Sequence, residues 1–409
     1  MRPASAAEKA RLNETFAELC RIPSPFGEER ACADEVTARL RAMGVDVEED
    51  DAGNPGAGAG SGTGAGGGTV AGAGTGAAAG NLLARIPGRS EGSILLCAHL
   101  DTVTQTASIE PVIVDDGWEN ANDGILGADN KAAVAVILEV ARRATTPSHP
   151  PPPVGIELLF TVSEEVGLVG AKRFDIGRLG SAFGFVFDHA TSIGEVVVAS
   201  PTYYRVVADF HGRAAHAGLR PEDGRSAVLA AAHAVAAMPL GRIDAETTAN
   251  VGSLIGGSGS ANVVPERATV LAEARSLDPD RVETVVAQLI DALHDGAASA
   301  ECDVDVTSER LFAGYRQRPA SPALATAEAA LRACGYEPTR VATGGGSDAN
   351  AFEAAGFTCV NLANGTERNH EPTERVAVAA LEDMLDVTLA LLDAAAAVLD
   401  GAAVPDSRR

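Results

Sequence analysis

Hydrophobic and polar positions along the chain follow a pattern that predicts strands and helices in turn. Residues 93–101 (SILLCAHLD), 155–165 (GIELLFTVSEE) and 183–190 (FGFVFDHA) are nearly continuous apolar runs that end on polar residues, as buried strands of a parallel sheet do. Residues 129–144 (DNKAAVAVILEVARRA) instead place apolar side chains at helical spacing. The pattern predicts an α/β fold with a mixed, largely parallel central sheet flanked by helices.

The middle of the chain has a different order of elements. Between residues 200 and 313 the pattern predicts strand, helix, strand, strand, helix and strand, which is the βαββαβ order of a ferredoxin-like α+β unit. The α/β pattern then resumes. We therefore expect a larger domain in two parts, residues 1–199 and 314–409, interrupted by an inserted domain at residues 200–313. Residues 52–80 are mostly glycine and alanine, and we expect a flexible loop because ordering them would bury few side chains.

Charge and cysteine usage narrow the possible functions. The 409 residues carry a net charge of −24, and such a surface repels phosphate, so neither nucleic acid nor an anionic membrane is an expected partner. The chain shows no apolar signal-peptide core and no apolar run long enough to span a membrane, so we expect a cytoplasmic protein. The 6 cysteines are far apart and form no CxxC pair, which argues against a disulfide framework or a thiolate zinc site.

Histidine and carboxylate side chains occur where the predicted strands end. The carboxyl ends of strands in an open α/β sheet form the crevice in which such folds bind their ligands. Alternation along a strand also places residues two positions apart on the same face. The candidate residues are His99, Asp101, Asp129, Glu164, Glu165, Asp188 and His370.

Two adjacent carboxylates, Glu164 and Glu165, are difficult to explain by structure alone. Like charges at the end of a buried strand repel each other and lose solvation, and a divalent cation would relieve both costs. One carboxylate would bind the metal while its neighbour accepts a proton from metal-bound water. A helix cap would also explain Asp129, and a solvated loop would explain His370. Together, however, the histidines and carboxylates indicate a two-metal hydrolase using zinc, with cobalt or manganese as alternatives.

Several stretches of the chain resemble the co-catalytic zinc peptidases, a family that includes peptidase T, carboxypeptidase G, aminoacylase and succinyl-diaminopimelate desuccinylase. The resemblance covers nearly the whole chain except the glycine-rich segment, and it is strongest to the peptidase T-like branch. The stretches that carry it are CAHLDTV, GILGADNKAAVAVILE, TVSEEVGLVGAK, HGRAAHAGLRPEDGRSA, MPLGRIDAETTANVG, NVVPERATVLAEARSLD and TGGGSDANAF.

The resemblance implies how the metal ligands are shared. His99 and Asp188 would hold one zinc ion, Glu165 and His370 would hold the other, and Asp129 would bridge the two. In this family a cis peptide follows the bridging aspartate, and here that bond would join Asp129 to Asn130.

The resemblance also implies roles outside the metal ligands. Glu164 would be the general base and then the proton donor, and Asp101 would orient the first histidine ligand. The inserted domain would mediate dimerisation and close over the substrate. Its His216 would stabilise the oxyanion in the active site of the partner subunit, while Asn250 and Arg275 would bind the terminal carboxylate of the substrate.

The sequence thus predicts a dinuclear zinc peptidase, and most of all an aminopeptidase that removes the N-terminal residue from tripeptides. The expected partners are a small peptide and a second copy of the chain. An N-acyl-amino-acid deacylase or a carboxypeptidase of the same family is the first alternative, because no residue can be assigned to binding a free substrate amine. A non-catalytic binding protein on the same scaffold is a more distant alternative, since all seven candidate metal and catalytic positions are filled.

Overall fold

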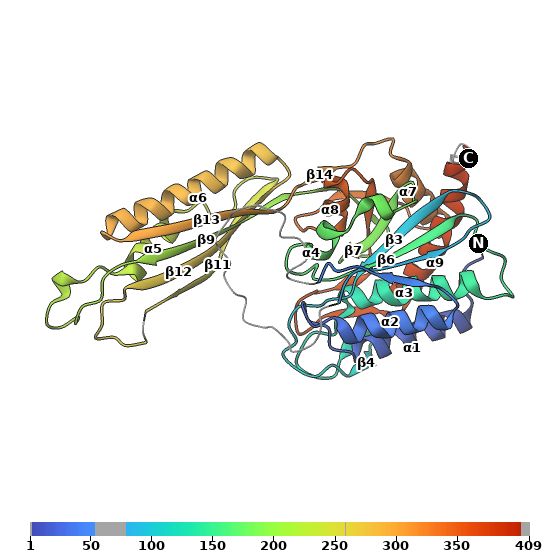
Figure 1. The fold of residues 1–409 in the computed structure, drawn as a ribbon, viewed down its shortest axis with the longest axis horizontal. Helices are drawn as coiled ribbons and strands as arrows, with labels where there is room; N and C mark the ends of the chain where they lie inside the picture. Colours follow the sequence, from blue (N-terminus) through green and yellow to red (C-terminus); the bar gives the residue numbers. More distant parts are fainter. Residues whose placement is uncertain (1, 54–78, 258, 402–409) are drawn as a thin grey trace.

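The computed structural model describes residues 2–53, 79–257 and 259–401. Figure 1 shows two bodies side by side, a larger α/β domain that contains both ends of the described chain and a narrower domain that extends from it. The chain enters the narrower domain after β8 and leaves it before β14, so the second body is an insertion in the first. The predicted fold class, an α/β domain with an inserted α+β domain, is confirmed.

The larger domain is built on a nine-stranded mixed sheet in the order β1-β2-β6-β3-β7-β16-β8-β14, with β15 paired to β8. The four central strands β6, β3, β7 and β16 run parallel, whereas β1, β2, β8 and β14 join antiparallel toward the edges. The strands are β1 (Val47–Glu49), β2 (Leu82–Ile86), β3 (Ser93–His99), β6 (Gly155–Thr161), β7 (Gly184–His189), β8 (Glu195–Ser200), β14 (Tyr315–Arg316), β15 (Thr339–Ala342) and β16 (Cys359–Ala363).

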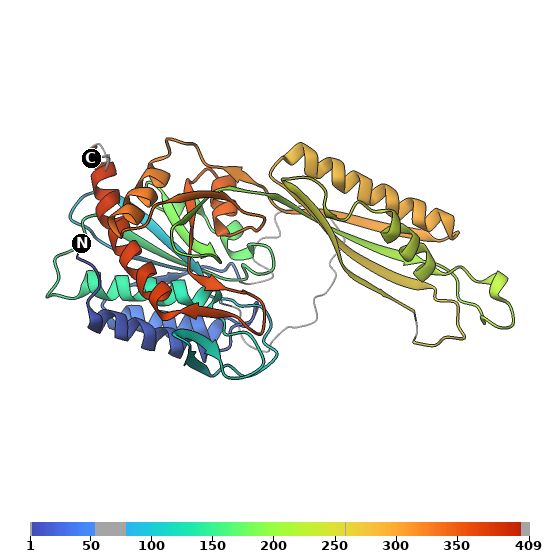
Figure 2. The same ribbon diagram turned by 180° about the vertical axis from the view of Figure 1, so that it is seen from behind.

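Helices cover both faces of this sheet. Successive residues of β3 alternate between two cores: Leu96 packs with the long helices on one face, and Leu95 and Cys97 pack with shorter helices on the other. Figure 2 shows α9, in red, lying across the face of the sheet that the long helices cover. The long helices are α1 (Ala6–Cys20), α2 (Arg30–Ala42), α3 (Ala128–Thr145), α7 (Pro322–Ala333) and α9 (Val378–Leu399). The short ones are α4 (Val169–Arg173), the 3₁₀ turn η1 (Ile176–Arg178) and α8 (Asp348–Ala354).

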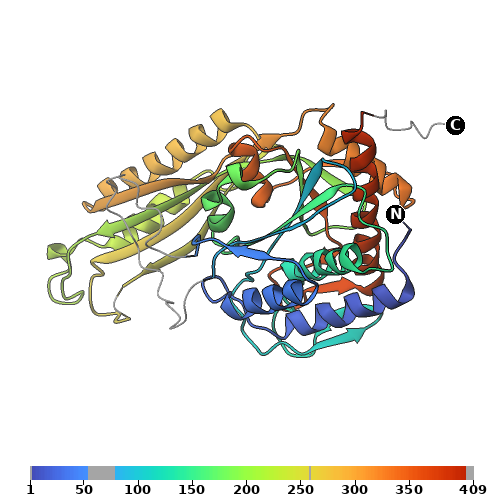
Figure 3. The same ribbon diagram turned by 45° about the vertical axis from the view of Figure 1, so that its right-hand side comes forward.

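The inserted domain has the predicted ferredoxin-like order βαββαβ, with one additional two-residue strand, β10, after the first helix. Its five-stranded antiparallel sheet runs β10-β11-β12-β9-β13, and α5 and α6 share one hydrophobic core with a single face of that sheet. Among the described residues no helix covers the other face, which is called the open face below, and Figure 3 shows α6 on the opposite side of the sheet. The elements are β9 (Thr202–His211), η2 (Pro221–Asp223), α5 (Ala227–Ala237), β10 (Gly241–Arg242), β11 (Thr247–Gly256), β12 (Arg267–Ser276), α6 (Pro279–Ser299) and β13 (Asp303–Phe312).

One small sheet is absent from the sequence prediction. It is four-stranded, in the order β17-β18-β5-β4, and it joins the loop before α3 to the loop before α9. Its strands are two to four residues long, too short for an alternating pattern to be recognised. They are β4 (Pro111–Val114), β5 (Gly117–Asn120), β17 (Thr366–Glu367) and β18 (Arg375–Ala377).

Two other predictions concern loops and membranes. Most of the glycine-rich segment predicted to be a flexible loop, residues 54–78, lies outside the described residues. The two ends that the structure does describe, Ala52 and Ala79, are buried. Among the described residues, none of the helices combines the length and the apolar character that a membrane span requires.

Candidate metal centre

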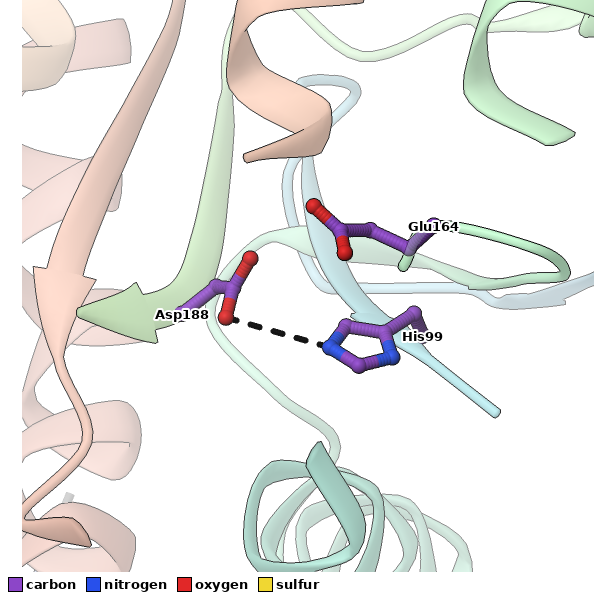
Figure 4. Close-up of side chains that lie close together, drawn as sticks. All are labelled: His99, Glu164 and Asp188. Atoms are coloured by element: carbon purple, nitrogen blue, oxygen red, sulfur yellow. Dashed lines mark ion pairs between the residues drawn. The ribbon is translucent and has the colours of Figure 1, made fainter. Parts of the chain in front are cut away.

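The candidate ligands meet at the carboxyl ends of the central parallel strands. His99 is the last residue of β3, Glu164 and Glu165 follow β6, and Asp188 lies near the end of β7. Figure 4 shows that His99, Glu164 and Asp188 project from three different segments into the same space. Because the parallel strands end at one edge of the sheet, residues far apart in sequence form a single cluster.

The distances divide this cluster into two neighbouring groups. His99 Nε2 lies 3.8 Å from Asp188 Oδ1 and 3.4 Å from Asp129 Oδ1. His370 Nε2 lies 3.5 Å from Asp129 Oδ2 and 3.0 Å from Glu165 Oε2. The two oxygens of Asp129 therefore face two different histidines, which is the geometry required of a carboxylate that bridges two cations.

Two overlapping sets of side chains are close enough to share an ion. The ligand atoms of His99, Glu164 and Asp188 lie within 4.8 Å of one another, and so do those of His99, Asp129 and Glu165. In the part of the chain that the structure describes, His99 Nε2, Asp129 Oδ1 and Glu165 Oε1 are buried polar atoms without a hydrogen-bond partner. Buried polar atoms are normally paired, so these donor atoms fit a site that is completed by metal ions.

The electrostatics of the cluster also favour cations. Burial raises the pKa of Glu164 well above its usual range, and the neighbouring carboxylate of Asp188 adds to this effect. Burial and the negative charge of Asp129 raise the pKa of Asp188 to about 8. Hydrogen bonds to Asp129 and Glu165 raise the pKa of His370 to about 10. The cluster therefore holds more buried negative charge than its histidines can neutralise, and divalent cations would supply the missing positive charge.

Asp101 is fully buried, and its contacts extend the role that the resemblance implied. Its carboxylate accepts hydrogen bonds from the backbone N–H groups of Glu164, at 2.9 Å, and Glu165, at 3.0 Å. The Nδ1 atom of His99 lies 2.9 Å from the backbone carbonyl oxygen of Asp101 but 3.5 Å from its carboxylate. Since a carbonyl oxygen only accepts, Nδ1 carries a proton, which leaves Nε2 as the ring nitrogen available to a cation in the cluster.

The start of α3 has an unusual backbone. The peptide bond between Asp129 and Asn130 is cis, as the resemblance implied, and both residues have non-helical dihedral angles inside α3. The side-chain amide of Asn369 donates a hydrogen bond of 2.8 Å to Asp129 Oδ2. His370 itself has a positive φ of 68°, a conformation uncommon outside glycine. The ligand-bearing segments are thus held in specific conformations by their surroundings.

Three buried side chains that the sequence reasoning missed support these segments. Asn361 clamps the backbone of Asp188, accepting from its N–H at 2.9 Å and donating to its carbonyl at 3.1 Å. Glu29 accepts from both the N–H and the hydroxyl of Ser163, at 3.0 and 2.9 Å. Glu374 accepts from three backbone N–H groups at the start of α3. None of the three lies in the sequence stretches that carry the family resemblance, so no sequence signal pointed to them.

The candidate substrate-binding residues lie on the inserted domain, and the structure brings one of them to the larger domain. Arg275 lies over the ring of Tyr203, 4.1 Å from its centroid, and donates a hydrogen bond of 3.2 Å to the carbonyl of Gly344 in the loop before α8. Asn250 is exposed on β11, and its register pairs it with Glu273, two residues from Arg275 on β12. Asn250 and Arg275 therefore share the open face of the sheet.

His216 is placed differently. It is exposed in the loop between β9 and η2, and it forms an isolated bridge with Val263 in the loop between β11 and β12. Figure 1 shows η2 at the end of the inserted domain that points away from the central sheet. Within one chain the structure therefore does not bring His216 to the histidine and carboxylate cluster.

An α/β sheet with this cluster at the carboxyl ends of its parallel strands, and with a ferredoxin-like domain inserted beside it, defines a class of metallohydrolase. Comparisons with known proteins agree with this class. Residues 81–187 match the model of peptidase family M28, and residues 202–301 match the peptidase dimerisation domain.

Similar proteins cover nearly the full length of the chain. The aminopeptidase PepT from Bacillus cereus is 35% identical with a TM-score of 0.77, covering 95% of this chain and 99% of that one. A tripeptidase from Staphylococcus aureus is 31% identical with a TM-score of 0.82, over 95% and 98% of the two chains. The uncharacterised protein YqjE from Bacillus subtilis is 33% identical over 94% and 98%. The chain therefore belongs to the peptidase T-like branch of the co-catalytic metallopeptidases, and it is a hydrolase.

Proposed function

We propose that the protein is a dinuclear zinc aminopeptidase that releases the N-terminal residue from tripeptides. The observation that carries this proposal is the position of Asp129 between His99 and His370, beside the adjacent carboxylates Glu164 and Glu165. The similarity to the PepT and tripeptidase structures, both above 30% identity, favours this substrate class.

The distances within the cluster support the following assignment of metal ligands. His99 and Asp188 would bind one ion, Glu165 and His370 would bind the other, and Asp129 would lie between them. Imidazole and carboxylate donors suit zinc, and cobalt or manganese could occupy the same ligands. When bound, the two ions would polarise the scissile carbonyl and lower the pKa of a water molecule near them.

Glu164 is proposed to move the proton. It lies in the cluster but is not one of the two carboxylates, Asp129 and Glu165, that lie beside His370. Desolvation and the charge of Asp188 raise the pKa of its carboxylate well above the usual range. It would take a proton from the attacking water and return it to the nitrogen of the leaving amine. The hydrogen bonds from the backbone N–H groups of Glu164 and Glu165 to Asp101 would keep both carboxylates in place.

The inserted domain is proposed to supply the rest of the site in a homodimer. The match to a peptidase dimerisation domain supports association of two chains. The exposed His216 lies in loops that lead away from the cluster of its own chain, so it would stabilise the oxyanion in the other subunit. Arg275 and Asn250, on the open face of the inserted sheet, would bind the carboxylate of the peptide.

Turnover of one tripeptide in two forms tests the proposal. The zinc-loaded protein is incubated with the free peptide and with its N-acetylated form, and the products are identified by mass spectrometry. We expect release of the N-terminal residue from the free peptide alone. Cleavage of the acetylated form would instead identify a deacylase or a carboxypeptidase. The Glu164→Gln variant, purified in the same way, controls for contaminating peptidases because it should cleave neither form.

A further inference from the structure

Glu374 is a buried carboxylate with an unusual set of partners. Its side chain is 2% exposed, and both carboxylate oxygens accept hydrogen bonds from the backbone at the start of α3. Oε2 accepts from the N–H groups of Leu126 and Gly127, at 2.9 and 2.8 Å, and Oε1 accepts from the N–H group of Asp129 at 2.9 Å. Glu374 lies 245 residues from Asp129 in sequence, so this is a tertiary contact and not a local helix cap.

The segment that Glu374 contacts, residues 126–129, has no acceptors of its own for these backbone N–H groups. Gly127 has a positive φ of 75°, and Asp129 is non-helical with φ −83° and ψ 105°. The first N–H groups of a helix have no intrahelical acceptor, and here they are buried away from water. Without Glu374, three amides would lose their partner, and the orientation of the Asp129 side chain between its two histidines would no longer be determined.

Glu374 also holds the other side of the cluster, because it lies four residues after His370 in the same loop. Arg368 and His370 both have positive φ values, 56° and 68°, so this loop adopts a conformation that non-glycine residues rarely hold without support. Two side chains attach the loop to the start of α3, one on each side of His370. Asn369 donates to Asp129 Oδ2, and Glu374 accepts from the Asp129 N–H group.

We propose that Glu374 is a positioning residue of the metal centre, which fixes the distance between Asp129 and His370 and thereby sets the affinity for metal ions. This inference rests on the proposed metal roles of Asp129 and His370. Glu374 faces backbone amides and has no place among the ligands, so it acts through the residues that bind. Partners that orient ligands typically contribute about 10–100-fold in metal affinity or activity.

The test is the metal affinity of Glu374→Gln, measured by calorimetric titration of the chelated protein with Zn²⁺. Glutamine keeps the length of the side chain but turns an NH₂ group toward amide N–H donors. We expect about a 10–100-fold weaker affinity at one or both sites, together with an altered visible absorption spectrum of the Co²⁺-loaded variant. Glu374→Asp keeps the charge and should lose less affinity.

Glu371→Gln is the matched control, because Glu371 is an exposed glutamate in the same loop, and its carboxylate accepts a long hydrogen bond, 3.5 Å, from the Thr373 hydroxyl. It should bind Zn²⁺ as the unchanged protein does. If Glu374→Gln only lowers the melting temperature of the chelated protein and binds zinc normally, Glu374 is a structural residue and the inference is wrong. The same holds if neither Glu374 variant folds. Failure of the unchanged protein to bind two ions would instead contradict the proposed function.

Discussion

The substitution Asp101→Asn separates the role of the buried Asp101 carboxylate from the role of the Asp101 backbone carbonyl. The two oxygens of Asp101 accept hydrogen bonds from the N–H groups of Glu164, at 2.9 Å, and Glu165, at 3.0 Å. Asparagine can keep one of these bonds, but its NH₂ group then faces the second N–H donor. The ring of His99 would be disturbed less, because its Nδ1 atom is bonded to the backbone carbonyl of Asp101 and this carbonyl survives the substitution.

The size of the effect follows from these contacts. Losing one hydrogen bond to a charged group and leaving a buried N–H unpaired costs about 1–3 kcal/mol. If that cost falls on the transition state, the rate decreases by about tenfold for each 1.4 kcal/mol. We therefore expect kcat/KM of Asp101→Asn to fall by about 10–100-fold, which is also the usual effect of removing a residue that orients a metal site. The melting temperature of the chelated protein should fall by about 1–2 °C for each kcal/mol lost, because the shift shrinks as the chain grows longer.

Steady-state kinetics on a tripeptide and zinc titrations check this prediction, with Asp46→Asn, at an exposed aspartate before β1, as the control. The zinc-saturated Asp101→Asn enzyme should show its loss mainly in kcat, because the turn that carries Glu164 moves while the His99 ring keeps its carbonyl partner. Unchanged kcat/KM would refute the reasoning. So would a variant that loses zinc affinity but is fully active once saturated, since that result would assign Asp101 to His99 alone.

Three further predictions concern catalysis, assembly and pH. Glu164→Gln should keep both metal ions, measured by elemental analysis, but lose about 10²–10⁴-fold in kcat because the base is removed; normal turnover would contradict the mechanism. His216→Ala and Glu164→Gln should each be inactive alone and should regain up to about a quarter of full activity when unfolded and refolded together, because a mixed symmetric dimer contains one intact site; no recovery would mean that His216 acts in its own chain. Zinc affinity, measured by titration at several pH values, should rise from pH 6 to pH 8. Hydrogen bonds to Asp129 and Glu165 raise the pKa of His370 to about 10, so zinc binding must release its proton. A zinc affinity that stays constant between pH 6 and pH 8 would exclude such release.

Long apolar runs made the fold predictable. The runs that became β3, β6 and β7 are continuous because each strand is covered on both faces, and this also placed His99, Glu165 and Asp188 at the ends where ligands gather. The βαββαβ order was equally visible, since a half-buried sheet alternates and its helices are amphipathic. The small sheet of β4, β5, β17 and β18 could not be predicted, because strands of two to four residues leave no periodic pattern.

The supporting residues could not be predicted for a different reason. Asn361 contacts the backbone of Asp188, which is 173 positions away in sequence, and Glu374 contacts the backbone of Asp129, which is 245 positions away. Contacts of that kind depend on the fold and not on any local spacing. A single asparagine in an apolar strand and a single glutamate after a loop have many simpler explanations. The resemblance to known peptidases identified candidate ligands because ligands recur as motifs, whereas the residues that hold them in place became visible only in three dimensions.

Hydrogen-bond partners distinguish the proposed ligands from the residues that support them, although both groups are buried acids. Asp101 and Glu374 accept N–H bonds on both oxygens, so backbone amides already occupy both of their carboxylates. Asp129 and Glu165 each keep a buried oxygen without a hydrogen-bond partner, beside a histidine. Burial raises the pKa of Asp188 to about 8, so without cations its charged form costs stability as the pH rises from about 4 toward 8. Metal ions would remove that cost for Asp188 and would also provide partners for the buried oxygens of Asp129 and Glu165, and the proposed function assigns all three residues as ligands.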